Sequence, residues 1–491
     1  MMRAELIFIP SPGVGHLVPM VELAKLLASR DEQISISILI MNLPFESDKA
    51  ALTQKLKKDA PEHITFVDIP DVDETTRTEL ISLPRMSFFN SFVENQRTQV
   101  RDIVVTILKN SKSGKLGGFV IDMLCTSMID VANEFNVPAY VFFTSGAAFL
   151  SLMFYVQNLK DNESQEVHEY KDSDVKLSPP GFINPVPVKV LPSMMLSKDG
   201  FPGVIAMARR LRKAKAILVN TVLELEAHAI KSLANDGNTP LIYHIGPIIH
   251  SMSGGAVINS NKSEEDIICW LNRQPLLSVV YLCFGSIGSF DTAQVTEIAQ
   301  ALELSGHRFL WSLRRPSQEM ERTELLTDYE DYNEVLSEGF LKRTSGIGKV
   351  IGWAPQMTIL SHPSVGGFVS HCGWNSTLES AWCGVPMATW PMYAEQQTNA
   401  FQLVKELGIA AEIKMDYRKD NSVSSEPSIL VTAKEIERGI SCLMDGESEM
   451  RTKMKEMKNI CRKAIVEGGS SNTSLGKFIE AVMDNFQEGS L

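Results

Sequence analysis

The stretch of residues 353–396 decides the fold and reads WAPQMTILSHPSVGGFVSHCGWNSTLESAWCGVPMATWPMYAEQ. Its centre, residues 366–380, consists of an apolar run, the turn HCGWNS and an amphipathic run, which together predict a strand, a turn and a helix. The amides at a helix start bind phosphate because the helix dipole places partial positive charge there. The stretch therefore predicts a site for a phosphorylated ligand.

The side chains around this turn suit such a ligand. Gly373 lets the backbone approach closely, and His371, Asn375 and Ser376 can donate hydrogen bonds to phosphate oxygens. In isolation, Asn375 or Ser376 would be read as an ordinary helix N-cap. A metal site at His371 and the adjacent cysteine would need partners at ligand spacing, which the sequence lacks.

Two further positions flank this centre. Trp353 ends a predicted strand, and ligands of open α/β sheets bind outside the carboxyl ends of strands, where an indole can stack on a flat base. Taken alone, Trp353 would be interpreted as a residue that packs in the core. Ser286, in the turn CFGSIGS after another apolar run, is similarly placed to reach phosphate.

Short apolar runs alternate with helical patterns along the chain, which is typical of parallel βαβ units. A first series is predicted at residues 6–10, 34–40, 64–69, 119–123, 139–143 and 216–220, the last of which should close that half. A second series is predicted at residues 278–285, 308–313, 349–355, 366–371 and 386–391. Such strands are usually buried on both faces by helices. The predicted fold class is α/β, with two doubly wound, Rossmann-like parallel sheets.

The length of 491 residues indicates two domains. We expect an N-terminal domain over residues 1–246, a Gly-, Ser- and Asn-rich linker over 247–262, a C-terminal domain over 263–470 and a final helix over 471–491. Residues 157–201 read as a long loop over the first half. The acidic residues 317–338 read as a solvated surface excursion.

Composition narrows the class of protein. Apolar residues make up 44% and charged residues 22%, as in ordinary globular proteins, and the net charge of -12 disfavours nucleic acid or an anionic membrane as partner. No apolar run reaches the ~18 residues of a membrane-spanning helix. Seven scattered cysteines without CxxC spacing predict free thiols, and no signal peptide is recognised, so a cytoplasmic protein is expected. The acidic balance is compatible with a monomer.

A histidine near the N-terminus is the candidate general base. In SPGVGHLVPM, the glycines allow a tight turn that brings His16 to the carboxyl edge of the first sheet. Neutral imidazole, with an ordinary pKa near ~6.5, accepts protons readily at neutral pH. Asp122 ends another strand at the same edge and would orient the ring. Alone, His16 would be a capping or packing residue and Asp122 a helix cap; together with residues 353–396 they predict a catalytic pair.

Two alternative functions from other classes are open to this sequence. A dinucleotide-dependent oxidoreductase would need a third glycine where Val18 stands and an acidic residue where Met41 and Asn42 stand. A non-catalytic protein that binds a nucleotide sugar or a metabolite could share the fold. The presence of His16, Asp122 and Gln396 argues for chemistry.

These motifs resemble the plant UDP-dependent glycosyltransferases of secondary metabolism, whose PSPG signature box corresponds to residues 353–396. The resemblance covers essentially the whole chain. It implies the GT-B fold, in which two Rossmann-like domains face each other across a cleft and the final helix crosses back onto the N-terminal domain. It further implies inverting transfer of glucose from UDP-glucose to a hydroxyl of a lipophilic acceptor, such as a flavonoid, another phenolic or a triterpenoid. The expected product is a β-glucoside, and no metal or other cofactor is expected.

The resemblance also implies roles for individual residues. For the base and ribose, Trp353 would stack on uracil, Ala354 would pair with the base edge, and Gln356 and Glu379 would hold the ribose. The positions that contact the hexose are Thr144, Trp374, Glu395 and Gln396. Glutamine at the last position of the box accompanies a preference for glucose in this family, whereas histidine accompanies galactose.

Apolar residues of the first half are the candidates for the acceptor pocket. They lie near predicted loops or helix ends and include methionines, which adapt to varied apolar shapes. For each of them, packing in the core is an equally good interpretation. The candidates are Phe88, Phe89, Phe149, Met153 and Met194.

Overall fold

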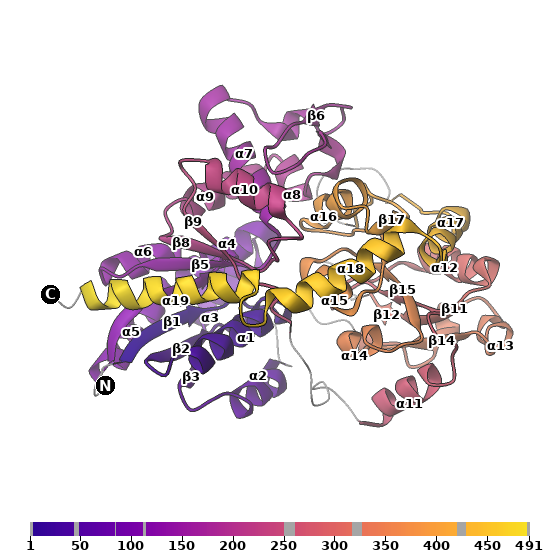
Figure 1. Cartoon of the computed structure of the whole chain (residues 1–491), viewed down its shortest axis with the longest axis horizontal. Helices are drawn as coiled ribbons and strands as arrows, with labels where there is room; N and C mark the ends of the chain where they lie inside the picture. Colours follow the sequence, from indigo (N-terminus) through magenta and orange to yellow (C-terminus); the bar gives the residue numbers. More distant parts are fainter. Residues whose placement is uncertain are drawn as a thin grey trace. The chain divides into compact units, whose positions relative to one another are not determined.

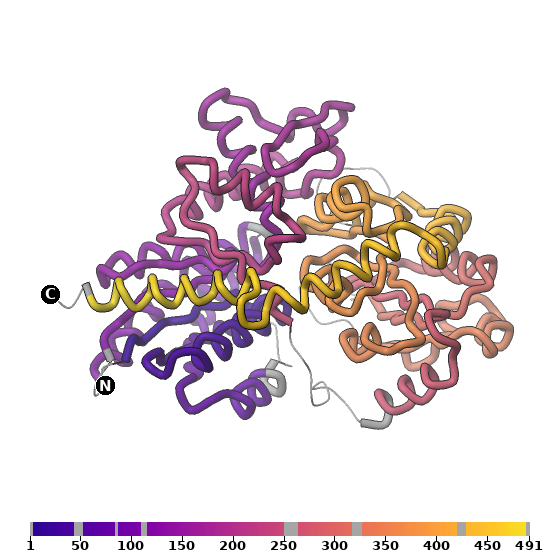
Figure 2. Tube along the Cα trace, in the orientation of Figure 1, coloured from indigo at the N-terminus to yellow at the C-terminus, as the bar shows by residue number. Residues whose placement is uncertain are grey.

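The computed structural model describes residues 3–43, 49–83, 85–110, 114–249, 261–316, 327–419 and 429–488 (Figure 2). The chain forms two compact units: the first comprises Met1–Gln165, Pro202–His250 and Lys463–Leu491, and the second comprises Glu166–Phe201 and Ser251–Arg462. Each unit contains a parallel sheet flanked by helices, so the predicted α/β class is confirmed. Across the described ranges, each helix is too short or too polar to cross a membrane.

In the described part of the first unit, a seven-stranded parallel sheet has the order β3-β2-β1-β4-β5-β8-β9. The strand order reverses between β1 and β4, because β2 and β3 extend the sheet to one side and the later strands extend it to the other. This reversal brings the carboxyl ends of β1 and β4 together, with Ile9 paired to Ile121. The strands are β1 (Arg3–Ile9), β2 (Ile34–Ile40), β3 (Ile64–Asp68), β4 (Gly114–Asp122), β5 (Ala139–Phe143), β8 (Ala216–Val219) and β9 (Leu241–His244).

Helices cover both faces of this sheet (Figure 1). One face packs against α1 (Val14–Arg30) and α19 (Ser470–Glu488), and α5 and α6 contact the strands of the other face. On α19, Phe478 makes edge contacts with the rings of Tyr140 and Tyr243, at centroid distances of 5.0 and 5.5 Å. The remaining helices of this unit are α2 (Lys49–Lys58), α3 (Glu74–Ile81), α4 (Arg85–Asn95), α5 (Arg97–Asn110), α6 (Met128–Glu134), α7 (Ala147–Glu163), α9 (Phe201–Leu211) and α10 (Ala227–Asn235).

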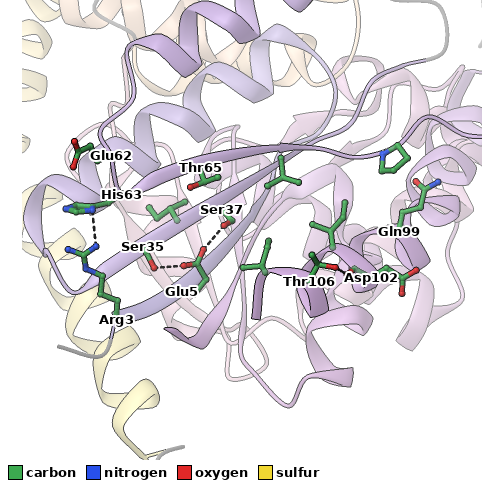
Figure 3. Close-up of a pocket in the computed structure, with 15 residues that line it drawn as sticks. Arg3, Glu5, Ser35, Ser37, Glu62, His63, Thr65, Gln99, Asp102 and Thr106 are labelled. Atoms are coloured by element: carbon green, nitrogen blue, oxygen red, sulfur yellow. Dashed lines mark hydrogen bonds between the residues drawn. The ribbon is translucent and has the colours of Figure 1, made fainter. Parts of the chain in front are cut away.

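The second face of β1–β3 is polar, although these strands were predicted to be buried on both faces. In ISISILI the isoleucines point to the α1 face, and Ser35 and Ser37 point to the opposite face, where both hydroxyls donate to the carboxylate of Glu5. A hollow of about 640 Å³ opens there beside α5, and its lining extends from Arg3 and Glu62 at the amino ends of the strands to Pro70, just after β3 (Figure 3). The carboxyl ends of β1 and β4 lie at the other edge of the sheet.

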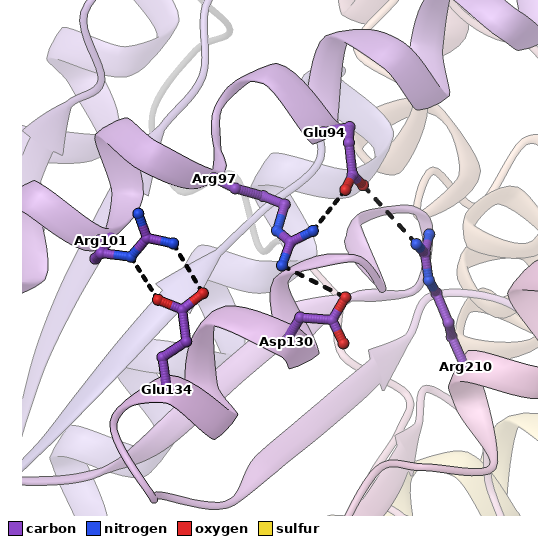
Figure 4. A network of polar contacts seen from close by, with 6 residues as sticks. All are labelled: Glu94, Arg97, Arg101, Asp130, Glu134 and Arg210. Atoms are coloured by element: carbon purple, nitrogen blue, oxygen red, sulfur yellow. Dashed lines mark hydrogen bonds and ion pairs between the residues drawn. The ribbon is translucent and has the colours of Figure 1, made fainter.

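Ion pairs tie four helices of the first unit together (Figure 4). Arg97 of α5 contacts Glu94 of α4 at 2.6 Å and Asp130 of α6 at 3.5 Å, and Glu94 also faces Arg210 of α9. Arg101 and Glu134 form a separate two-pronged pair. The groups are largely solvent-accessible, so each pair contributes at most about 1 kcal/mol.

In the second unit, six of the described strands form a parallel sheet in the order β14-β11-β10-β15-β16-β17, which reverses between β10 and β15. Trp311 and Trp390 are fully buried in its core, against α12 and α17. The strands are β10 (Val279–Cys283), β11 (Arg308–Ser312), β14 (Gly348–Ile351), β15 (Val365–Ser370), β16 (Met387–Thr389) and β17 (Ala410–Glu412). The helices of eight or more residues are α11 (Asn261–Leu271), α12 (Thr292–Ser305), α15 (Trp374–Cys383), α17 (Ala433–Met444) and α18 (Glu449–Ala464).

Two sheet edges differ from the expected strands. Residues 216–220 were expected to close the first half, but β9 adds a further strand, and β17 was not predicted in the second half. Both are edge strands of three or four residues with partly exposed side chains. Such strands carry little apolar periodicity, so the pattern that identifies buried strands is weak in them.

The division of the chain also differs from the expected domain boundaries. Residues 166–201 were assigned to the N-terminal domain, yet they group with the second unit. Hydrogen bonds explain this grouping: Thr398 Oγ1 donates to Val190 O at 2.9 Å, and the carboxylate of Glu406 accepts from the amides of Ile183 and Asn184 at 2.7 and 2.9 Å. Most of the expected linker, residues 250–260, lies outside the described residues.

The start of α7 supplies a test of the first unit's packing. Glu226 is 3% exposed, and its carboxylate accepts from the amides of Ala147 at 2.7 Å and Ala148 at 2.9 Å. We expect Glu226→Ala to lower the free energy of unfolding by about 2–4 kcal/mol, because two buried amides lose a charged acceptor. Urea denaturation measures this. Glu467→Ala, at an exposed position, should change it by less than ~0.5 kcal/mol, and equal effects would contradict the capping role.

Candidate active site

In the first unit, His16 lies in the first turn of α1, directly after β1. The turn is possible because Gly13, the helix N-cap, has φ 136°, a value that favours glycine. The side chain of His16 is 29% exposed, and its Nδ1 lies 2.9 Å from Oδ2 of Asp122. Asp122 is fully buried at the end of β4, so the strand reversal between β1 and β4 brings the two residues together.

Asp122 uses its two carboxylate oxygens differently. Oδ1 accepts from the amide of Leu124 at 2.9 Å and caps the short helix η1 (Met123–Cys125), whereas Oδ2 faces His16. Both interpretations of Asp122, as a cap and as a partner of His16, therefore hold at once. With the Nδ1 proton of His16 assigned to this bond, Nε2 is the nitrogen that can accept a proton.

Thr144 follows β5 and is 7% exposed. Its Oγ1 lies 3.1 Å from Nδ1 of His16. Thr144 was predicted to contact a sugar, and its contact with the histidine was not predicted. The contact adds a second polar group that holds the imidazole ring, and it arises because β5 is the next strand beside β4.

In the second unit, β15, a turn and α15 form the predicted strand–turn–helix unit. Gly373 is the N-cap of α15, and Ser376 and His371 are each 7% exposed beside it. A Cβ on Gly373 would lie 2.6 Å from Nε2 of His371, so glycine is required for this close approach. The helix start therefore presents its amides where the phosphate site was predicted.

His371 is an uncharged histidine in this turn. Burial lowers its pKa to about 4, so the ring is neutral at physiological pH. Among the described residues, its Nδ1 has no hydrogen-bond partner. A neutral imidazole has one N–H to donate. Two glycines from separate turns, Gly285 and Gly373, lie close to Nε2, and a Cβ on either would come within 2.6 Å of it.

Two non-glycine residues of the box have left-handed backbone conformations. Cys372 has φ 63° and Ala394 has φ 55°, and such strain persists where surrounding contacts enforce it, often at functional sites. For Cys372, the contact comes from Asn399, which is 1% exposed and donates from Nδ2 to Cys372 O at 3.0 Å. Asn399 was not among the predicted site residues, because nothing in its local sequence connects it with that turn.

Trp353 lies just after β14 and is 39% exposed, as a residue that stacks on a ligand should be. Its amide donates to Oδ1 of Asp328 at 3.1 Å, and Arg314 Nε forms an ion pair with the same oxygen at 2.7 Å. Asp328 belongs to the segment expected to be a solvated excursion. Residues 327–328 are exposed, as expected of a solvated segment, and they also form the short strand β13, which pairs with β12 (Arg314–Arg315). Residues 317–326 lie outside the described residues.

The residues expected near the ribose lie together. Nε2 of Gln356 donates to Oε2 of Glu379 at 2.6 Å and to Oγ of Ser376 at 2.8 Å. Gln356 begins the short helix α14 (Gln356–Leu360), and Ala354 precedes it by two residues. The three polar side chains thus form one connected group between α14 and α15.

The end of the box forms a second polar turn. Glu395 is the N-cap of α16 (Gln396–Phe401), and Gln396 is 3% exposed. Oε1 of Gln396 accepts from the amides of Met392 and Tyr393 at 2.9 and 3.1 Å, which assigns Nε2 as the end that can donate to a ligand. Trp374 is 2% exposed, so its indole packs inside the unit, and we expect any hexose contact to come from its main chain.

The acceptor candidates are divided between the two units. Phe88, Phe149 and Met153 are 8%, 4% and 2% exposed, which matches core packing. Phe88 stacks on Phe92 at 6.0 Å, and Phe89 is partly buried on the same helix, α4. Met194 belongs to α8 (Ser193–Leu196) in the second unit. The acceptor pocket therefore remains a prediction.

Comparisons with known proteins agree with this arrangement. A family model described as UDP-glucoronosyl and UDP-glucosyl transferase matches residues 242–424. UDP-glycosyltransferase 71E1 of Stevia rebaudiana is 53% identical over 98% of this chain and 99% of its own. UDP-glucose flavonoid 3-O-glucosyltransferase 6 of Fragaria ananassa is 50% identical over 98% of each chain. The crystal structure of Medicago truncatula UGT71G1 complexed with UDP-glucose has a TM-score of 0.85 and 40% identity over 98% of both chains.

Two Rossmann-like units, each with polar groups at the point where its strand order reverses, define a glycosyltransferase of the GT-B fold. The chain belongs to the plant UDP-glycosyltransferase family. It is an enzyme that transfers a glycosyl group from a UDP-sugar to a small-molecule acceptor.

Asn399 provides a test of the strained turn. We expect Asn399→Leu to raise the KM for the UDP-sugar roughly tenfold with little change in kcat, because Cys372 loses the bond that holds the turn. Steady-state kinetics with varied donor measures both constants. The control Gln294→Leu, on α12, removes two buried hydrogen bonds to the main chain of Val431, and it should lower the Tm without changing the donor KM. A similar KM increase in both variants would refute the specific role.

His371 provides a test by pH. An unfolded histidine binds a proton near pH ~6.5, but the folded protein resists protonation of His371 until about pH 4. Stability from this residue is therefore complete above pH ~6.5 and falls as the pH drops toward 4. Between pH 7 and 5, urea denaturation should show a loss about 2 kcal/mol larger in the unchanged protein than in His371→Gln. The exposed control His228→Gln should keep the full loss, and identical pH dependence in His371→Gln would contradict the argument.

Proposed function

We propose that this enzyme transfers glucose from UDP-glucose to a hydroxyl of a lipophilic phenolic acceptor, such as a flavonoid, with inversion at the anomeric carbon. The observation that supports chemistry at this site is the pair formed by His16 and the fully buried Asp122, 2.9 Å apart. Glucose is favoured by Gln396 at the end of the box. Relatives named as flavonoid glucosyltransferases, and the related structure complexed with UDP-glucose, support the donor and the acceptor class.

In the proposed reaction, the acceptor hydroxyl gives its proton to Nε2 of His16. The acceptor oxygen forms a bond to the anomeric carbon of UDP-α-glucose as the bond from that carbon to the β-phosphate oxygen breaks. UDP leaves toward the amides of the α15 start, where partial positive charge stabilises the growing negative charge. The product is a β-glucoside, and the imidazolium returns its proton to solvent.

The carboxylate of Asp122 stabilises the imidazolium that forms on His16 and holds the ring in its tautomer. The negative charge of UDP is met by the helix start and by neutral donors such as His371 and Ser376, so the proposal requires no metal. Within the described ranges, no three His, Cys, Asp or Glu side chains group closely enough to hold a metal ion. We also propose that the protein is a cytoplasmic monomer, as its free cysteines and acidic charge suggest.

The catalytic pair predicts a large effect on turnover. We expect His16→Ala to lower kcat by roughly 10²–10⁴-fold with an aliphatic alcohol acceptor, because such a hydroxyl ionises poorly without a base. The loss should be smaller with an acidic phenol. Liquid chromatography–mass spectrometry of the product formed from UDP-glucose measures turnover. The NMR coupling constant of the anomeric proton identifies the β-glucoside.

UDP affinity, measured by calorimetry, should be nearly unchanged in His16→Ala. His228→Ala, an exposed histidine of the same unit, is the control and should keep full activity. Unchanged turnover of the aliphatic acceptor by His16→Ala would disprove the base assignment. Product with another UDP-sugar but not with UDP-glucose would disprove the donor.

A further inference from the structure

Residues 417–419, after β17, connect loops of the second unit that carry candidate donor residues. Tyr417 O accepts from Nε2 of Gln397 at 2.9 Å, and the amide of Lys419 donates to Met392 O at 2.9 Å. The first bond reaches α16 just after the box, and the second reaches the turn before α16. The ring of Tyr417 also packs against Trp390, with centroids 5.9 Å apart. The segment is therefore fixed to one side of the donor site.

Arg418 connects the same segment to a more distant part of the chain. Its guanidinium donates to Leu191 O at 2.6 Å, to Lys189 O at 2.7 Å and to Ser193 Oγ at 3.0 Å. These residues lie just before Met194, an acceptor candidate. Residues 417–419 are thus held by two separate stretches of the second unit. These contacts fix the position from which the side chain of Lys419 extends.

Lys419 extends from this base to the turn after β10. Its ammonium group donates to Oγ of Ser289 at 2.6 Å and also to the main-chain carbonyl of Ser289. Ser289 is 4% exposed. Charge-assisted hydrogen bonds of this kind are stronger than neutral ones, particularly away from water. Lys419 therefore fixes the far end of the turn formed by residues 285–289.

The near end of that turn is fixed by close packing. A Cβ on Gly285 would lie 2.6 Å from Nε2 of His371, and one on Gly288 would lie 2.0 Å from Phe284 O and 2.9 Å from the sulfur of Met392. Between these contacts, Ser286 remains exposed at the tip. The turn thus presents Ser286 beside the phosphate-binding turn of His371.

We propose that Lys419 is a positioning residue for the donor: its ammonium group holds the turn of residues 285–289 so that Ser286 and the His371 turn bind the diphosphate together. This inference rests on the proposed function, because it takes a UDP-sugar as the ligand. Lys419 acts through Ser289 and does not itself touch the ligand.

The charge state of Lys419 gives this proposal a measurable signature. Burial lowers the pKa of Lys419 to about 8, against the opposing effect of the Asp291 carboxylate at the start of α12. Tyr417, on the same segment, has a pKa of about 12, and His371, at the other end of the turn of residues 285–289, has a pKa of about 4. Neither group changes charge between pH 7 and 9.5. The terminal phosphate of UDP completes its ionisation near pH ~6. Loss of the Lys419 proton should therefore loosen the turn in this range.

The experiment is calorimetric titration of UDP into the full-length protein from pH 7 to 9.5. Affinity of the unchanged protein should fall roughly three- to tenfold as the pH rises through about 8. Lys419→Arg, which stays charged, should remove this fall. Lys419→Met should bind UDP roughly three- to tenfold more weakly at pH 7, without pH dependence, and should raise the donor KM while kcat stays within about twofold.

Lys405→Met removes an exposed lysine, paired with Glu412 in the same unit, and should behave like the unchanged protein. Raising the salt from 0.1 to 0.5 M should leave the effect of Lys419→Met intact, because a half-buried contact is screened little. An effect that vanishes with salt, or a Lys419→Met protein that binds UDP normally, would overturn the proposal. If Lys419→Met does not fold, a pH profile of Lys419→Arg identical to that of the unchanged protein would overturn it equally. Absence of UDP binding by the unchanged protein at pH 7 would instead refute the donor site itself.

Discussion

The reversal of strand order in each sheet is the constraint on which the candidate site depends. In a parallel sheet all carboxyl ends lie at one edge, and where the order reverses, the connections leave in opposite directions and the edge stays open. In the first unit the reversal brings Asp122, at the end of β4, beside His16, which follows β1. In the second unit it places the turn after β10 beside the turn after β15. Two similar sheets thus supply two different kinds of site.

The two sites differ because of what the turns contain. In the first unit, a buried carboxylate faces a partly exposed imidazole, which is suited to moving a proton. In the second unit, glycines bring backbone close to a buried, neutral histidine, and the helix start supplies the positive end of a dipole. A chain with a net charge of -12 can hold a diphosphate in this way, because oriented amides act locally and do not require a positive surface.

The turns of the second unit are held by residues outside the signature box. Asn399 holds the left-handed Cys372, Asp328 holds the amide of Trp353, and residues 417–419 connect the remaining turns. None of these was predicted as a site residue. Each acts on a partner that is distant in sequence or lies in an unrelated turn, so no local pattern could reveal the contact. Strained turns of this kind persist because several independent contacts enforce them.

The sequence by itself determined the α/β class, the approximate positions of the buried strands, the strand–turn–helix unit of the box and the pairing of His16 with Asp122. These follow from local patterns and from the rule that parallel strands end at one edge. The tertiary structure alone decided the edge strands β9 and β17, the grouping of residues 166–201 with the second unit, and the burial of Phe88, Phe149 and Met153. Those features depend on contacts between segments far apart in the chain, whose free energies no local window of sequence contains.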